Sequence, residues 1–325
     1  MSKDKYSSGD GYMYVYLLSI VACVVVALVV ALMVFGSGLF KKNNESNPVI
    51  GDTSETSSTV SEDNTSYSDS DVSESSRFTQ GSVDNAVVNT GLLVLVDSNH
   101  KYVFPEEDDR VNLFAALKGS NISFSGSGIT MNTTAAKALK AMCEAFYAES
   151  GMDSGVLVYN AYRSYDKVAE TDGADAAGTS DFHTGNSVTL MSWPASLGEI
   201  GEGRFAWFTE NCYSYGFIQR FPADKESVTG YPPNGTINRG VVYRYVGVCH
   251  AYYMYKNNLC LEEYLELLKQ YTHENPLIID VQNKSYEVYY QPMEDGLTSS
   301  INIPIESAYL ISGNNSDGFI VTITG

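Results

Sequence analysis

The stretch GVLVYNAYRSYDK, residues 155–167, decides the fold, because an apolar run passes directly into a cluster of polar and charged residues. The apolar part predicts a short buried strand. This strand would deliver Tyr162, Arg163 and Ser164 at its end, ahead of a polar, Gly- and Ala-rich loop over residues 169–179. Binding and catalytic groups concentrate where a rigid element passes into a loop. This strand end is therefore the first candidate site.

Upstream of this strand, the sequence predicts one further strand and a long helix. The apolar run from Leu92 to Val96 is predicted to form the strand. The helix starts at Thr133 and ends at Gly151, a residue type that readily takes the left-handed conformation found after helices. Its apolar positions recur at three and four residues, the spacing of one helix face: Leu139, Met142, Cys143 and Phe146.

Downstream of the strand, the chain mixes helices and strands without a repeated βαβ order. The spacing of apolar residues predicts helices over 205–215 and 261–271, with Gly216 ending the first. Strands are predicted over 217–221 and 242–246. We therefore expect an α+β domain with a mixed or antiparallel sheet and flanking helices.

The C-terminal residues 274–325 have a different pattern. Apolar and polar side chains alternate there, with turn residues between the alternating runs. This alternation is typical of strands that bury one face. We expect three or four strands that form a small β annex.

An uncharged apolar run over residues 13–38 is long enough for a helix that crosses about 30 Å of hydrocarbon. It exceeds the apolar core of a cleaved signal peptide, and no clean small-x-small site follows, so we expect an uncleaved transmembrane signal anchor. Residues 1–12 would then be a short cytoplasmic tail. The charge bias that sets orientation is a tie, because two lysines stand on each side: Lys3, Lys5, Lys41 and Lys42.

Residues 39–85 are rich in Ser, Thr, Asp, Glu and Asn and poor in large apolar side chains. Such a segment has too little apolar surface to offset the entropy cost of ordering its backbone. We expect a disordered linker, extended by repulsion among its acids, that holds the folded domain away from the membrane.

The charge balance excludes one class of partner. With 39 acidic and 20 basic residues, the chain has a formal net charge of -19. It would repel nucleic acid phosphates, so we expect no nucleic acid partner.

The five cysteines form no CxxC pair that would indicate a zinc or redox site. Their pattern favours small buried side chains. A disulfide of Cys212 with Cys249 or Cys260 stays open outside the cytoplasm, since spacing alone does not assign it.

Four blocks, in order, resemble the VanY-type D-alanyl-D-alanine carboxypeptidases of the bacterial cell wall. The match runs from about Leu92 to Tyr271, inside a domain that we place at residues 86–273. Because dispersed blocks keep their order and spacing, the resemblance implies the family's fold. The blocks are YNAYRSYDK from Tyr159, SDFHTGNSVTL from Ser180, ENCYSYGFIQRFPADKESVTGY from Glu210, and YRYVG followed by LEEYL.

The resemblance also implies a zinc site, and this chain has replaced its residues. Family members hydrolyse the terminal D-Ala–D-Ala bond of stem peptides with one zinc ion. The pattern S-x-H-x-x-G-x-x-x-D supplies two ligands, and a later E-P-W-H supplies the general base and the third ligand. Aligned on the shared serine and glycine, Phe182 stands at the first histidine and Thr189 at the aspartate. Aligned on YRYVG, Arg239 stands at the base glutamate and Val242 at the last histidine.

These four replacements remove the chemistry that the family needs. Zinc is held by imidazole, carboxylate or thiolate lone pairs at about 2.0–2.3 Å. Phe182 and Val242 have no lone pairs, Thr189 offers a neutral hydroxyl, and Arg239 carries only donors. We therefore expect no catalytic residue, no metal and no cofactor, although the family is expected to carry zinc.

His183 offers an alternative, since sliding the alignment by one residue would make it the first ligand. The slide moves the shared glycine off the pattern and puts Leu190 at the aspartate position. A relocated site built from His183, His250 and a cysteine would make the chain an active zinc D-Ala–D-Ala carboxypeptidase. An active zinc enzyme of this kind is the alternative to a non-catalytic protein.

The substrate-holding residues of the family survive in part. The resemblance implies that Arg163 clamps the terminal carboxylate of a peptide and that Ser180 donates a hydrogen bond to it. Arg239 would add a second cation where the family holds its zinc. Arg163 and Ser180 could instead satisfy each other and the nearby backbone.

The function that follows from these expectations is a non-catalytic wall protein. It would be a single-pass membrane protein of a Gram-positive bacterium, with its domain outside the cytoplasm. Its partners would be peptidoglycan stem peptides or other cell-wall proteins, and its role would be binding, scaffolding or regulation.

Overall fold

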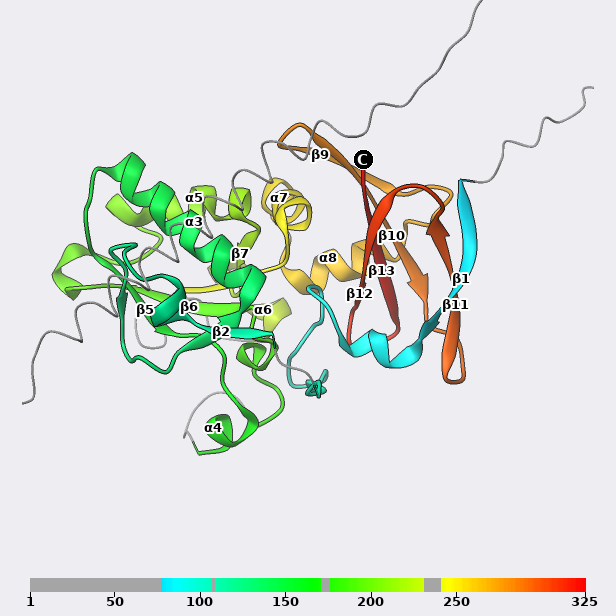
Figure 1. The fold of residues 1–325 in the computed structure, drawn as a ribbon, viewed down its shortest axis with the longest axis horizontal. Helices are drawn as coiled ribbons and strands as arrows, with labels where there is room; N and C mark the ends of the chain where they lie inside the picture. Colours follow the sequence, from blue (N-terminus) through cyan, green and yellow to red (C-terminus); the bar gives the residue numbers. More distant parts are fainter. Residues whose placement is uncertain (1–76, 107–108, 171–175, 231–240) are drawn as a thin grey trace, which may run out of the picture. The chain divides into compact units, whose positions relative to one another are not determined.

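The candidate site lies on a five-stranded sheet (Figure 1). Its strands are β3 (Ser123–Phe124), β5 (Val156–Asn160), β6 (Ser187–Ser192), β7 (Phe217–Gln219) and β8 (Val241–Tyr245). They lie in the order β3-β5-β6-β8-β7. β3 runs parallel to β5 and the remaining pairs are antiparallel. The mixed sheet with helices confirms the predicted α+β class.

The computed structural model describes residues 77–106, 109–170, 176–230 and 241–325. The predicted membrane span at 13–38 and Arg239 lie outside the described residues. Among the residues that are described, no helix is both long enough and apolar enough to cross a membrane.

The long predicted helix is present as α3 (Thr133–Ser150) and covers one face of this sheet. Its expected apolar face is buried, and Phe146 packs against Phe205 and Phe208 at centroid distances of 5.5 and 4.6 Å. Gly151 follows it with φ 67°, the left-handed conformation that a glycine adopts without strain. The helix and its end are therefore confirmed.

The remaining helices are short. The predicted helix at 205–215 divides into α5 and the 3-10 turn η6, and Gly216 ends it with φ 81°. The helix predicted at 261–271 is α8. The α-helices besides α3 are α2 (Leu113–Ala116), α4 (Tyr165–Ala169), α5 (Ala206–Asn211), α6 (Glu226–Thr229), α7 (Val248–Lys256) and α8 (Leu261–Leu268). The 3-10 turns are η2 (Asn85–Asn89), η3 (Asp181–Thr184), η4 (Ala195–Leu197), η5 (Gly203–Phe205), η6 (Cys212–Tyr215) and η7 (Ala223–Lys225).

The C-terminal residues form more strands than the three or four expected. They are β9 (Leu277–Val281), β10 (Lys284–Pro292), β11 (Thr298–Pro304), β12 (Ala308–Gly313) and β13 (Gly318–Thr324). A four-stranded antiparallel sheet has the order β12-β13-β10-β9. In a separate pair, β11 joins β1 (Phe78–Asp84), and a further short pair joins β2 (Arg110–Asn112) to β4 (Thr130–Asn132).

Strand β1 corrects the boundary of the expected linker. Residues 39–85 were assigned to it, yet Phe78–Asp84 pair along their whole length with Thr298–Pro304. The sequence FTQGSVD shows little apolar periodicity, and its partner lies at the other end of the chain. Residues 78–84 therefore belong to a strand and not to a linker.

The segment from Leu92 to Val96 is buried but is not a strand, so that prediction is wrong. Two of its carbonyl oxygens, those of Leu92 and Val94, accept hydrogen bonds from Nη2 of Arg244 at 3.1 and 3.0 Å. A guanidinium thus supplies donors that a neighbouring strand would otherwise supply.

Candidate functional site

The loop that leads into β6 carries most of the aligned positions. It passes through η3 (Asp181–Thr184) and turns at Gly185, which has φ 69°. A Cβ at this glycine would lie 2.5 Å from Oδ1 of Asn132, so a larger residue does not fit. The backbone N–H of Arg163 donates to the carbonyl of Phe182 at 3.4 Å. The strand end predicted as a site therefore lies against this loop.

Two of the replaced ligand positions lie side by side. Thr189 on β6 and Val242 on β8 are directly paired across the two strands. The hydroxyl of Thr189 donates to Oδ1 of Asn160 at 3.4 Å, and its side chain is buried. Phe182 is also buried and lines a cavity of about 160 Å³ together with Phe221.

The described side chains at these positions do not fit a zinc ion. Phe182 and Val242 offer no lone pair, and the Thr189 hydroxyl is not among the groups that hold zinc in proteins. Within the described ranges, no group of three or more His, Cys, Asp or Glu side chains is placed to hold a metal. Arg239, the fourth replaced position, lies outside those ranges.

Ser180 and Arg163 do not satisfy each other. The Ser180 side chain is completely buried, and its Oγ has no hydrogen-bond partner among the described residues. The Arg163 guanidinium donates from Nη2 to the carbonyl of Lys167 at 3.4 Å. The two side chains therefore do not bond to each other, whereas Arg163 does bond to nearby backbone, as the structural alternative expected.

His183 is engaged at both ring nitrogens. Its Nε2 accepts from the backbone N–H of Gly178 at 3.0 Å, so Nδ1 carries the proton of the neutral ring and donates to the carbonyl of Arg163 at 2.6 Å. The neutral imidazole therefore links the backbone at Gly178 to the backbone at Arg163. Neither nitrogen has a lone pair left for a metal.

His250 is likewise engaged at both nitrogens. Nδ1 lies 2.8 Å from the hydroxyl of Tyr264, and Nε2 lies 3.1 Å from the hydroxyl of Thr322. Burial lowers the pKa of this imidazole to about 4. His250 thus joins α7 to α8 and β13 as a neutral polar bridge.

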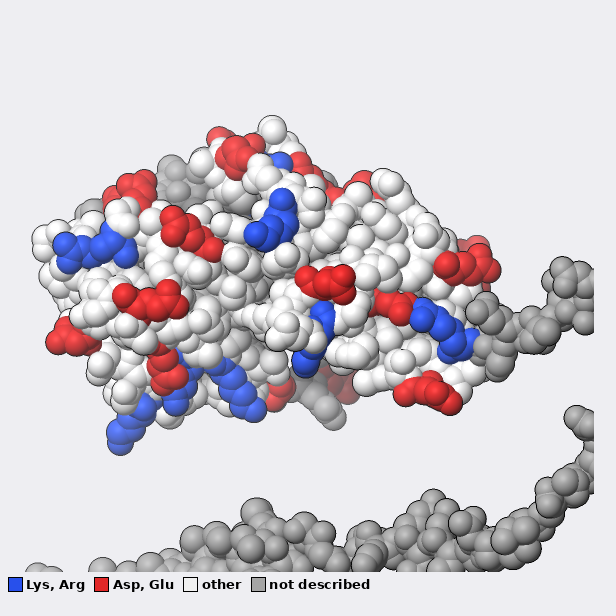
Figure 2. Space-filling model, turned by 90° about the horizontal axis from the view of Figure 1, so that it is seen from above, with Lys and Arg blue, Asp and Glu red and all other residues white. Residues whose placement is uncertain are grey.

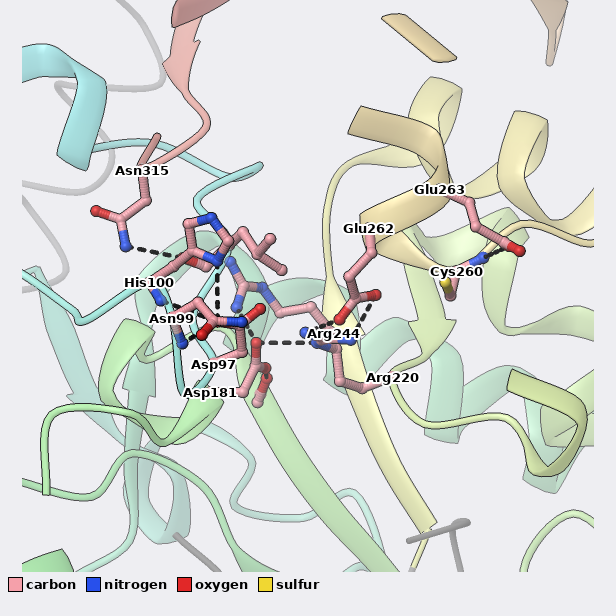
Figure 3. Close-up of polar contacts among 12 residues, drawn as sticks. Asp97, Asn99, His100, Asp181, Arg220, Arg244, Cys260, Glu262, Glu263 and Asn315 are labelled. Carbon is pink, nitrogen blue, oxygen red and sulfur yellow. Dashed lines mark hydrogen bonds and ion pairs between the residues drawn. The ribbon is translucent and has the colours of Figure 1, made fainter. Parts of the chain in front are cut away.

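A buried ion network, which the sequence reasoning missed, holds Asp181, the first residue of η3 (Figure 3). Oδ1 of Asp181 accepts from Nε of Arg220 at 3.0 Å and from Nη1 of Arg244 at 2.9 Å. Its other oxygen accepts from the hydroxyl of Ser187. Arg220 also forms a two-bond pair with Glu262, at 3.1 and 2.8 Å.

The charges of the network balance, and its side chains are almost completely buried. Both guanidinium groups are fully buried, and two carboxylates offset them. The two arginines hold the pKa of the Asp181 carboxyl below its usual range, although desolvation acts in the opposite direction. The signal for this network was present in the sequence, as arginines inside the apolar blocks FIQRF and YRYVG.

The cysteines in the described ranges form no disulfide. The thiols of Cys143, Cys212, Cys249 and Cys260 are all buried and free. Burial raises the pKa of Cys212 and of Cys249 to about 12, so both stay protonated. The open pairing of Cys212 with either Cys249 or Cys260 is therefore not found.

On the face of the molecule seen in Figure 2, acidic and basic side chains are interspersed, and several basic side chains lie close together along its lower left edge.

The chain is similar to known cell-wall peptidases. No family model matches it. A D-alanyl-D-alanine carboxypeptidase of Enterococcus faecium is 35% identical over 184 residues, which is 54% of this chain and 56% of that protein. One of Enterococcus faecalis is 37% identical over 121 residues, 36% of this chain and 42% of that protein. The chain thus spans about half the length of these curated relatives.

The likeness extends to a solved structure. The vancomycin-resistance D,D-dipeptidase VanXYg, solved in complex with a D-Ala-D-Ala phosphinate analogue, matches 76% of this chain and 99% of its own, with a TM-score of 0.62 and 26% identity. The chain therefore contains a D-alanyl-D-alanine carboxypeptidase-like domain. More particularly, its resemblance to the VanY-type family is confirmed.

Proposed function

We propose that this chain is a membrane-anchored cell-envelope protein whose VanY-like domain binds the ends of peptidoglycan stem peptides without hydrolysing them. The described positions that align with the zinc ligands, Phe182, Thr189 and Val242, supply no competent donor set. The positions that align with the peptide clamp keep Arg163 and Ser180. VanXYg binds a D-Ala-D-Ala analogue, and this likeness supports the same peptide end as the ligand here.

The buried hydroxyl of Ser180 is the observation that carries the proposal. A buried polar group without a partner costs about 1–3 kcal/mol, and a peptide end whose binding opened a way to this hydroxyl would remove that cost. The neighbouring Arg163 would pair with a peptide carboxylate through two parallel bonds. Arg239 would add positive charge where the family has its metal, which further favours an anionic peptide end.

The alternative of an active enzyme with a relocated metal has no support from the described residues. His183 and His250 would each have to give up two hydrogen bonds to bind a metal. Buried thiols, held protonated by desolvation, are also poor ligands until they ionise.

The test uses the full chain purified in detergent. Metal analysis should find no stoichiometric zinc, incubation with a peptide ending in D-Ala-D-Ala should release no D-alanine, and calorimetric titration should detect binding of that peptide. Arg163→Ala should abolish binding, whereas Arg204→Ala, a change at an exposed arginine outside the aligned positions, should not. Chelator-sensitive release of D-alanine would show that the chain is an enzyme.

The proposed location has its own test. We place the N-terminus in the cytoplasm and the chain after Lys42 outside, because the related enzymes act on the cell wall. Protease added to intact cells with permeable walls should then cut between residues 43 and 76. Cutting only after lysis would reverse this topology.

A further inference from the structure

A second pocket, of about 280 Å³, lies on another side of η3. His183 lines it, whereas the adjacent Phe182 lines the smaller cavity of about 160 Å³. Tyr162 lines it too, whereas Arg163 does not. The pocket is therefore distinct from the proposed peptide site.

Aromatic rings form much of its wall. Tyr102 and Phe104 meet edge to face at 4.9 Å, and Phe104 meets the ring of His183 at 4.9 Å. Phe104 is still 39% exposed despite these contacts. An apolar ring face is thus available to a ligand.

The buried amide of Asn186, which lines this pocket, keeps one free donor. Asn132 donates from Nδ2 to the carbonyl of Thr184 and to Oδ1 of Asn186, both at 3.0 Å. Because a backbone carbonyl only accepts, this pattern fixes the orientation of both amides. Nδ2 of Asn186 is left without an acceptor in the described parts of the chain, although Asn186 is only 3% exposed and lines the pocket.

The charges around the pocket favour a neutral ligand. Arg110 and Asp109 both line it, so a cation and an anion offset each other. The Arg110 guanidinium lies over the ring of Tyr162, with Cζ 3.1 Å from the ring centroid. It therefore presents a planar polar edge and not an isolated charge.

We propose that this pocket binds an N-acetylated amino sugar. The apolar C–H face of such a sugar packs on aromatic rings such as Phe104, and its acetamido carbonyl accepts from Nδ2 of Asn186. The hydroxyls meet polar side chains such as Thr90 and Asp109, which also line the pocket. The volume is at the small end for ligand sites, which suits one sugar ring. This site goes beyond the proposed peptide binding and does not depend on it.

The test is a titration of the full chain with a trimer of N-acetylglucosamine, beside cellotriose, which lacks the acetamido group. The acetylated trimer should bind saturably and more tightly than cellotriose. Phe104→Ala should weaken it by about tenfold, the equivalent of one lost stacking contact. Asn186→Asp, which keeps the shape but removes the free donor, should abolish the preference over cellotriose.

Two controls separate this site from others. Tyr255→Ala, at an exposed tyrosine on α7 that does not line the pocket, should leave sugar binding unchanged. Arg163→Ala should also leave it unchanged, so failure of the peptide proposal would not affect this result. The inference is overturned if the acetylated trimer does not bind, if cellotriose binds equally well, if Phe104→Ala has no effect, or if Arg163→Ala removes the binding.

Discussion

At the scale of single residues, the replaced zinc positions now hold side chains that fill space or bond to their neighbours. Phe182 is 6% exposed, and Thr189 is likewise 6% exposed and bonds to Asn160. Pairing of Thr189 with Val242 keeps two of the ligand positions adjacent across β6 and β8. Restoring the side chains therefore tests whether the backbone has kept the family's geometry.

We predict that the combined variant Phe182→His, Thr189→Asp and Val242→His binds about one zinc per chain, because three competent donors would then converge. Metal analysis after dialysis measures this. Each single reversion should bind none, since one ligand does not hold zinc. Adding Arg239→Glu to the combined variant supplies the general base as well. This fourfold variant is the one in which release of D-alanine is measured. A combined variant that holds no zinc after dialysis would refute the prediction.

His250 gives a second prediction at this scale. Its folded pKa of about 4 lies below the ordinary value of 6.5. Between these values the unfolded chain binds more protons, so the free energy of unfolding falls as pH drops from 6.5 to 4 and loses nothing more from this group below 4. The loss should be on the order of 3 kcal/mol.

Urea unfolding at several pH values measures the effect. His250→Gln should flatten the pH dependence between 6.5 and 4. An unaltered pH profile in His250→Gln would assign the acid sensitivity to other groups.

At the scale of elements, the periodicity of apolar residues predicted helices correctly, whereas the pairing of strands far apart in the sequence was not predicted. The helix from Thr133 and its end at Gly151 were predicted, because both signals are local in sequence. Strand β1 was missed, since its partner β11 lies some two hundred residues away. The run from Leu92 was taken for a strand, because no sequence rule shows that the Arg244 side chain bonds to its carbonyls.

In the candidate site, too, local sequence signals were predictive and contacts made by tertiary packing were not. Arg163 and the loop with Phe182 were brought together as expected, because the family blocks carry that arrangement. The buried charges around Asp181 went unrecognised, because Arg220 and Arg244 each stand alone in an apolar block and only the fold brings them to Asp181. Pairing of charges across elements depends on tertiary packing, which a single sequence does not display.

The Asp181 network gives a prediction about these elements, because it connects η3 with β8, α8 and the end of β7. Asp181→Asn should lower the free energy of unfolding by about 3–5 kcal/mol, since it leaves two buried guanidinium groups short of a counter-charge. Denaturant unfolding measures it. Glu266→Gln, which breaks an exposed pair with Lys269, should change stability by less than about 1 kcal/mol. Equal effects of the two changes would show that the network is not buried in solution.

At the scale of the whole molecule, the annex shares a core with the peptidase-like domain. Leu261, Tyr264 and Leu268 of α8 belong to the same buried cluster as residues of the annex sheet: Leu277, Ile279, Val281, Val288 and Ile320. His250 also reaches β13 through Thr322. The predicted boundary at residue 274 thus separates segments that bury apolar surface against each other.

We predict that deleting residues 274–325 prevents stable folding, because it would expose the apolar faces of α7 and α8 to water. The truncated chain should aggregate or bind a hydrophobic dye, and should lose a cooperative thermal transition. Deleting residues 1–76 is the matched control, since each of the three buried clusters consists of residues after that point. That deletion should leave the transition unchanged. A truncated chain that ends at residue 273 and still unfolds cooperatively would show that the annex is an independent domain, with the shared cluster contributing little to the stability of either part.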